Sequence, residues 1–317
     1  MLRYLTRRLV FAILVVFLVT VLTFVLLHLL PGGPARGILG MEATPDQIAR
    51  FNQEKGFDQP LYTQYWDYLV RLLHGDLGDS YTKNEPVSAL LAQRLPKTLL
   101  LTVIYTLIGI IIALPAGIWQ AVRRNRAADH ILTTLSFLLY ATPVFFLSLL
   151  LIILFSQVLP WFPAQAAQDE SLGSVLADPG SLVLPIVAGA AAVVAAFSRY
   201  MRSSTLDNLA QDYVRTARAK GTSERRIILR HVFRNSLTSV VSMLGYYIPV
   251  IFGGALVIES MFNYPGIGLL FWSAAQEQDY PVLLGVVLLI AVATVVGSLL
   301  ADLAQLFIDP RVRTAKR

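Results

Sequence analysis

The sequence predicts an all-α integral membrane protein that crosses the bilayer six times. Charged residues make up only 15% of the 317-residue chain, against about 25% in soluble domains. Hydrophobic residues reach 56% and the mean hydropathy is +0.62, as expected when much of the outer surface faces lipid. Six apolar runs are long enough to cross about 30 Å of hydrocarbon. They are 9–30, 98–121, 131–159, 181–200, 236–258 and 281–306.

The positions of Lys and Arg orient these spans. Apart from Arg199, at the edge of the fourth run, every Lys and Arg lies outside the runs. This fits the cost of about 2.5–3.5 kcal/mol for placing such a side chain in the middle of the membrane. Nineteen of the 26 cations lie in the two terminal segments and the second and fourth connections, whereas the connections 160–180 and 259–280 carry none. The positive-inside rule therefore predicts that both termini are cytoplasmic.

The first apolar run, 9–30, has a second interpretation as a cleaved signal peptide, because three arginines precede it. The run is longer than the roughly 7–15 residues of a signal-peptide core, and the sequence LPGGPARG that follows has no clear cleavage site. We expect it to be retained as a membrane anchor.

The long connection 31–97 is predicted to be extracytoplasmic and folded as a small helical cap. Thr44-Pro45-Asp46 is a helix-start signal, and GDLGDS at 75–80 supplies glycine turns. An aromatic stripe is expected to pack within this cap or to rest at the bilayer interface, with ligand binding as the alternative. The stripe consists of Tyr62, Tyr65, Trp66 and Tyr68.

The fourth connection, 199–235, predicts two amphipathic helices that meet at Gly221. Apolar residues recur at helical spacing on both sides: Leu206, Leu209 and Val214 before the glycine, then Ile227, Ile228, Leu229, Val232 and Phe233 after it. Glycine readily adopts the left-handed conformation that ends a helix, and Thr222 or Ser223 followed by Glu224 is suited to start the next. Such a basic elbow fits either a membrane-surface helix that meets anionic lipid or a docking surface for a cytoplasmic protein.

Several kinds of catalytic site have no support in the residues. No lysine follows a glycine, so a GxxxxGK[ST] phosphate-binding loop is impossible. The four histidines form no HExxH pair, and the chain has no cysteine. We therefore expect no metal site, no catalytic residues and no cofactor in this chain.

Polar groups within the predicted spans are the default functional candidates in a membrane protein. Among acidic residues and histidines, only His28 and Asp302 lie within the runs; we expect His28 to be interfacial and Asp302 to pair with an arginine of 199–234. Hydroxyl groups could line a translocation path or serve helix packing. The path candidates are Thr142, Ser242, Tyr246 and Tyr247.

The segment TARAKGTSERRIILRHVFRN resembles the cytoplasmic signature loop of ABC importer permeases, an E-A-A pattern followed after three residues by glycine. Ala217 and Gly221 match that pattern, whereas Arg215 and Thr216 replace its first two letters and Phe233-Arg234 replaces a later Leu-Pro. The rest of the chain resembles the dipeptide/oligopeptide/nickel permease subgroup in LLPGGP, FDQPLYTQY, GDLGDS, PGIGLL, DYPVLLGVVLL and the terminal DPRVR.

The resemblance implies a type I ABC importer permease in the plasma membrane of a prokaryote. Its function would be ATP-driven import of short peptides, with nickel, glutathione or oligosaccharide as alternative solutes. A secondary transporter or channel is the rival from another class. The implied partners are a homologous second permease, two cytoplasmic ATPases that bind ATP and Mg, an extracytoplasmic solute-binding protein and membrane lipid, without nucleic acid. The implied parts are a peripheral first helix (1–30), the extracytoplasmic segment (31–97), a five-helix core (98–308) and a cytoplasmic tail (309–317).

The resemblance also assigns candidate site residues. The loop 212–235 would couple to the ATPase through Asp212, Arg215, Ala217, Arg218, Gly221, Glu224 and Arg225. A second loop would face the binding protein, or would cap the helix bundle as a re-entrant turn. It comprises Asn263, Tyr264, Pro265, Gly266 and Gly268.

Overall fold

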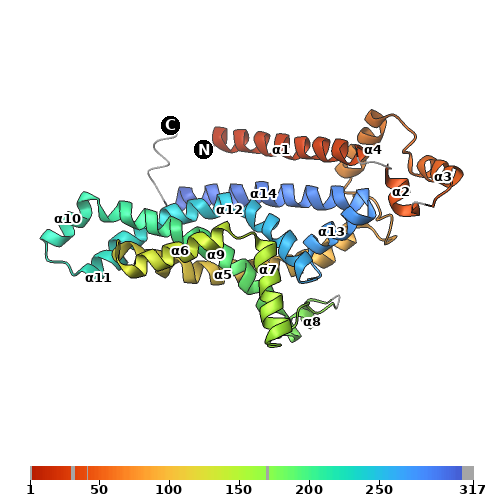
Figure 1. The fold of residues 1–317 in the computed structure, drawn as a ribbon. Helices are drawn as coiled ribbons and strands as arrows, with labels where there is room; N and C mark the ends of the chain where they lie inside the picture. The colour runs from red at the N-terminus through yellow and green to blue at the C-terminus, as the bar shows by residue number, and fades with distance from the viewer. Residues whose placement is uncertain (1, 30–32, 41, 169–170, 309–317) are drawn as a thin grey trace. The chain divides into compact units, whose positions relative to one another are not determined.

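The computed structural model describes residues 2–29, 33–40, 42–168 and 171–308, and these are helical except for connecting segments and one isolated β-bridge between Asp79 and Pro86 (Figure 1). Residues 309–317, the predicted tail, lie outside the described residues. The helices, in chain order, are α1 (Leu2–His28), α2 (Gly33–Leu39), α3 (Pro45–Lys55), α4 (Leu61–Leu73), α5 (Val87–Val122), α6 (Ala127–Ala141), α7 (Val144–Ile152), α8 (Leu172–Ala177), α9 (Pro179–Leu209), α10 (Asp212–Ala219), α11 (Glu224–Arg226), α12 (Phe233–Met261), α13 (Ile267–Glu277) and α14 (Tyr280–Ile308); π-helical turns at Ile153–Val158 and Ile227–Val232 extend α7 and α11.

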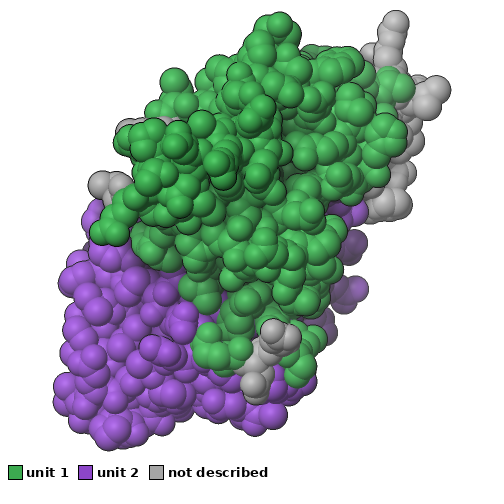
Figure 2. Space-filling model, turned by 90° about the vertical axis from the view of Figure 1, so that its right-hand side faces the viewer, with its two compact units in different colours: residues 1–98, 168–172, 265–295 green, residues 99–167, 173–264, 296–317 purple. Residues whose placement is uncertain are grey.

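The chain divides into two compact units, which Figure 2 colours separately. The first comprises 1–98, 168–172 and 265–295, and the second comprises 99–167, 173–264 and 296–317. Residues 265–295 thus group with the N-terminal segment, although the sequence places them in the five-helix core.

Four of the described helices are long and apolar enough to cross a membrane: Thr6–His28 within α1, all of α5, all of α9, and Tyr280–Leu300 within α14. Each contains most of one predicted span. The predicted span 236–258 lies in α12, some of whose side chains fall outside the described residues. The total of six spans and the side on which the termini lie therefore stay predictions.

The predicted third span, 131–159, is broken in the middle. Helices α6 and α7, with the π-helical turn that follows, are bent by 101° and form either one broken span or a re-entrant loop. The cause is Thr142-Pro143. Proline disfavours the helical conformation in the preceding residue, and Thr142 accordingly has an extended ψ of 122°. The Thr142 Oγ1 donates to the Leu138 carbonyl at 2.7 Å and helps to end α6.

In the second unit, α9 is the central helix and packs against α6, α7 and α12. Glycines let α5 approach it closely. A Cβ on Gly109 would lie 2.5 Å from the Cβ of Val193, and one on Gly117 would lie 2.6 Å from the carbonyl oxygen of Ser198. Small residues at such contacts are how helices pack in membranes, where no hydrophobic effect drives them together. Neither position has room for alanine without a shift of the neighbouring helix.

In the first unit, the end of α1, α4 and the start of α5 enclose an apolar cluster with α13 and the start of α14. The predicted start of α3 is confirmed: Thr44 is its N-cap, the Gln47 N–H donates to Thr44 Oγ1, and the Thr44 N–H donates to Gln47 Oε1. This reciprocal capping box satisfies two N–H groups that would otherwise lack partners. The predicted glycine turns are also present, since Gly75 and Gly78 have φ of 79° and 78°.

Candidate functional site

The elbow predicted in the fourth connection, which we define as residues 212–235, is present. Helix α10 ends at Ala219, and Gly221 has φ of +75°, the left-handed conformation. The Gly221 N–H donates to the Arg218 carbonyl at 2.9 Å, and the Thr222 N–H donates to the Ala217 carbonyl at 3.1 Å. These bonds close the helix end and turn the chain into α11.

A small apolar core holds the two arms of the elbow together. Val214, Ile227 and Val232 are fully buried, and Leu209, Tyr213 and Ala217 pack around them. Ala217 therefore supports the elbow from the inside. Leu229 is 56% exposed, because two residues advance a helix by about 200° and so place it on the side opposite the buried Ile227.

Two ion pairs lie on the outer face of the elbow. Arg218 Nε and Nη2 donate to the two carboxylate oxygens of Glu224 at 2.6 and 3.2 Å, so this pair bridges the glycine turn. The hydrogen bond from Arg218 lowers the pKa of the Glu224 carboxyl group. Arg215 Nη1 lies 3.4 Å from Asp212 Oδ1, and both side chains are largely exposed. Ser223 stands at the N-cap of α11 but makes no capping hydrogen bond through its side chain.

A shallow hollow of about 450 Å³ lies on the second arm and is lined by Ser223, Arg225, Arg226, Leu229 and Arg230. Of these residues only Arg225 was a sequence-derived candidate. The i,i+4 spacing of Arg226 and Arg230 places both on one helix face and could have identified them. Three cations beside an exposed leucine can bind an acidic surface that also offers an apolar contact.

A buried ion pair joins α6 to α9 near the elbow. Asp129 is 2% exposed, and its carboxylate accepts two hydrogen bonds from Arg202, at 2.8 and 2.9 Å. The Asn125 N–H and the Thr133 hydroxyl also donate to it, at 3.0 and 3.2 Å. Nothing in the local sequence pattern indicates this pairing, since 73 positions separate the two partners.

Two of the four translocation-path candidates bond within their own helix, and one packs against another helix. The Thr142 hydroxyl bonds within α6, as described above, and Ser242 Oγ donates to the Thr238 carbonyl at 3.0 Å. Tyr247 packs edge-on against Phe197, with ring centroids 5.2 Å apart. The side chain of Tyr246 lies outside the described residues, and so does that of Asp302, together with the ion pair predicted for it.

The loop that joins α12 to α13 is mostly buried. Tyr264 is fully buried, and its N–H donates to the Glu259 carbonyl at 2.8 Å. Pro265, Gly266 and Gly268 are also buried, whereas Asn263 is half-buried. This burial favours the interpretation as a turn that caps the bundle over one that projects toward a partner.

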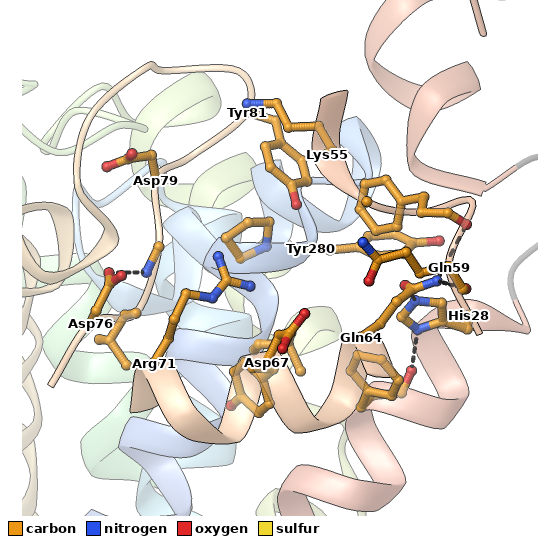
Figure 3. A pocket seen from close by; sticks show the side chains of 18 of the residues that line it. His28, Lys55, Gln59, Gln64, Asp67, Arg71, Asp76, Asp79, Tyr81 and Tyr280 are labelled. Carbon is orange, nitrogen blue, oxygen red and sulfur yellow. Dashed lines mark hydrogen bonds between the residues drawn. The ribbon is translucent and has the colours of Figure 1, made fainter. Parts of the chain in front are cut away.

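The first unit contains an open, polar cavity of about 670 Å³ (Figure 3). Gln64, Asp67 and Arg71 of α4 line its floor. His28 closes one end: its Nδ1 lies 2.8 Å from the Phe24 carbonyl oxygen and its Nε2 lies 3.0 Å from Gln64 Oε1. Of the aromatic stripe, Tyr68 is buried and Tyr65 half-buried, whereas Tyr62 and Trp66 are exposed.

Asp279 ties the turn at 78–86 to the corner between α13 and α14. The carboxylate is 1% exposed, and its Oδ2 accepts from Ser80 Oγ at 2.5 Å, from Thr82 Oγ1 at 3.0 Å and from the Thr82 N–H at 3.2 Å. Among the described residues, its second oxygen, Oδ1, has no hydrogen-bond partner. Nearby, burial raises the pKa of the Tyr81 hydroxyl to about 12, so this side chain is neutral at physiological pH.

Comparison with known proteins gives a consistent result over the whole chain. Residues 113–314 match the family described as binding-protein-dependent transport system inner membrane component, and residues 1–102 match the N-terminal membrane component of such systems. The glutathione transport system permease proteins GsiC of Escherichia coli K12 and Salmonella typhi are each 38% identical over 313 residues, which is 99% of this chain and 99% of theirs. A solved structure described as inward-facing conformations of the MetNI methionine ABC transporter has a TM-score of 0.55 at 14% identity, covering 70% of this chain and 97% of that one. At this identity the likeness concerns the fold alone.

Proposed function

The chain belongs to the family of binding-protein-dependent transport system inner membrane components, as an ABC importer permease of the dipeptide/oligopeptide/nickel type, and we propose that it imports short peptides. The names of its relatives support a peptide solute, because glutathione is itself a tripeptide. Glutathione is accordingly the specific alternative to dipeptides and oligopeptides.

We further propose that the elbow couples the permease to an ATPase. The observation that carries this proposal is the construction of the elbow, in which an apolar core and the left-handed Gly221 hold two helices at a set angle. Such a rigid corner can transmit a displacement, whereas a flexible loop would absorb it. Arg215 and the arginines of the hollow offer exposed charge to an acidic groove, and the sequence has no phosphate-binding loop with which to hydrolyse ATP itself.

The partners that complete this function are a second, homologous permease, two ATPase subunits that hold ATP and Mg, and an extracytoplasmic solute-binding protein. The two permeases would share the translocation path. For the loop 263–268 we propose the capping role, because its residues 264–268 are buried.

Reconstitution of the assembled transporter in liposomes tests the proposal. Uptake of a labelled dipeptide or of glutathione should require ATP, the binding protein and both ATPase subunits, and vanadate should abolish it. Uptake that persists without the ATPases would show a secondary transporter or channel. ATP-dependent uptake of nickel or an oligosaccharide, without peptide uptake, would refute the peptide assignment alone.

Charge reversal tests the coupling role. Arg215→Glu should leave insertion intact but reduce both ATPase co-purification and uptake. Arg124→Glu, at an exposed cation of the second connection, is the matched control and should retain both. Equal losses in the two variants would show a general effect of cytoplasmic charge instead of a contact made by the elbow.

A further inference from the structure

Helix α4 has three distinct faces. Successive residues turn by about 100° around a helix axis, which places Gln64, Asp67 and Arg71 together on the side that floors the cavity (Figure 3). Tyr65, Tyr68 and Leu72 pack into the apolar cluster of the first unit. The third face lies roughly opposite the cavity and carries large exposed side chains. These are Tyr62, Trp66 and Leu73, which are 77%, 66% and 85% exposed.

Contacts with α1 fix the level of α4 relative to the first predicted span. Tyr65 Oη lies 3.0 Å from Thr20 Oγ1, and the rings of Tyr68 and Phe24 are 6.3 Å apart. The apolar span in α1 runs from Thr6 to His28, so Thr20 lies about 12 Å inside its end at 1.5 Å per residue. Even allowing for the length of the Tyr65 side chain, the backbone of α4 lies beside the last turns of this span.

The position of α4 beside the last turns of this span indicates that lipid contacts its exposed face. The same turns of α1 expose Leu22 and Leu26 at 60% and 63%, on positions turned away from the α4 contacts. These leucines face lipid if α1 spans the bilayer. Tyrosine and tryptophan are enriched where a membrane meets water, because their rings are apolar and their tips are polar. Polar and apolar faces on opposite sides are the signature of a helix that lies in the interface plane.

We propose that α4 lies in the interface between the membrane and water on the extracytoplasmic side, with Tyr62, Trp66 and Leu73 among phospholipid headgroups and upper acyl chains. Its Asp67–Arg71 edge then faces water in the cavity. The described part of the segment 31–97 is accordingly a cap that rests on the membrane, with α4 at the bilayer surface. This inference does not depend on the identity of the solute.

Because the chain has no cysteine, a single spin label can be attached to it before it is assembled with its partner subunits, and the label then tests this orientation in the complete transporter in liposomes. Tyr62→Cys and Leu73→Cys should give labels accessible to oxygen, which partitions into lipid, and protected from a water-soluble nickel chelate. Asp67→Cys, on the opposite face of the same helix, is the matched control and should show the reverse. Exposure of all three labels to the chelate would overturn the proposal. Protection of 62 and 73 from both reagents would also overturn it, because a protein partner would then cover the face.

A second readout leaves the face unaltered. In a variant that keeps Trp66 and replaces Trp119, Trp161 and Trp272 with Phe, the emission should be blue-shifted. Lipids brominated near the headgroup should quench it more than lipids brominated at the chain ends. Emission typical of water-exposed tryptophan, with no quenching by either lipid, would refute the placement.

Discussion

The conformation of Gly221 predicts how substitutions at this position rank. No atom lies within 4 Å of a Cβ built at Gly221, so a side chain there meets no steric obstacle. The cost of substitution comes from the backbone instead, because φ is +75°. Residues other than glycine pay about 1–2 kcal/mol to adopt this conformation, asparagine less than most and β-branched residues the most. The expected order of function is therefore Gly221, then Gly221→Asn, Gly221→Ala and Gly221→Val.

The magnitude follows from these values. A loss of about 1–2 kcal/mol lowers the ratio of folded to unfolded elbow by roughly 5- to 30-fold. Burial of Val214, Ile227 and Val232 contributes about 1.5–3 kcal/mol for each side chain before the entropy cost of ordering them. The substitution thus removes a substantial part of a small net stability. Uptake should fall by no more than about 5- to 30-fold in Gly221→Ala. It should fall further in Gly221→Val than in Gly221→Ala.

Two measurements on the reconstituted transporter test this ranking. Initial uptake rates, normalised to inserted protein, should follow the stated order, and hydrogen exchange of the elbow amides should accelerate in the same order. Gly221→Asn is the informative variant, because asparagine is larger than alanine but tolerates the left-handed region better. If Gly221→Ala retained more function than Gly221→Asn, side-chain size would be the cause and the backbone argument would be refuted.

Three further predictions concern the ion pairs and the buried carboxylate. Asp129→Ala should destabilise the permease by about 2–3 kcal/mol in detergent unfolding, below the value for a fully buried pair because Arg202 is 26% exposed; removing Arg202 as well should restore part of the loss. The lowered pKa of Glu224 means that its pairing with Arg218 contributes above the carboxyl group's unfolded pKa and is lost as pH falls through the folded value. Protection of the elbow amides should therefore decrease at acidic pH in the wild type but not in Glu224→Gln. Asp279→Ala should cost about 2–3 kcal/mol and Asp279→Asn about 1 kcal/mol, because the amide oxygen can still accept the same donors; equal costs would contradict this.

Local features of the fold could be predicted from the sequence because their causes lie within a few residues. Thr44 and Gln47 form a capping box from side chains three positions apart. The elbow follows from apolar residues at helical spacing on both sides of Gly221, which adopts the left-handed conformation without the steric cost of a Cβ. Apolar length likewise identified α1, α5, α9 and α14 as candidate spans.

Features that depend on distant partners or on irregular helix phase could not be predicted in this way. The pairing of Asp129 with Arg202 requires α6 to lie against α9. Ile227 and Val232 are both buried, although five residues of a regular α-helix would place them about 140° apart; the π-helical turn at Ile227–Val232 brings them to the same side. The apolar run 131–159 predicts one unbroken span, whereas Pro143 ends α6 at this point and the two helices are bent by 101°.

The close contact between α5 and α9 has a mechanical consequence. A Cβ on Gly109 or on Gly117 would lie less than 3 Å from atoms of α9, so the two backbones are in close contact only because neither position carries a side chain. A displacement of α9 would therefore act directly on α5, with no flexible side chain between the two backbones at these positions. Helix α9 has 31 residues, a length of about 46 Å, and ends at Leu209, just before the elbow begins at Asp212. A push on the elbow would thus reach the end of α9 at Leu209 first and then α5, through the contacts at Gly117 and Gly109.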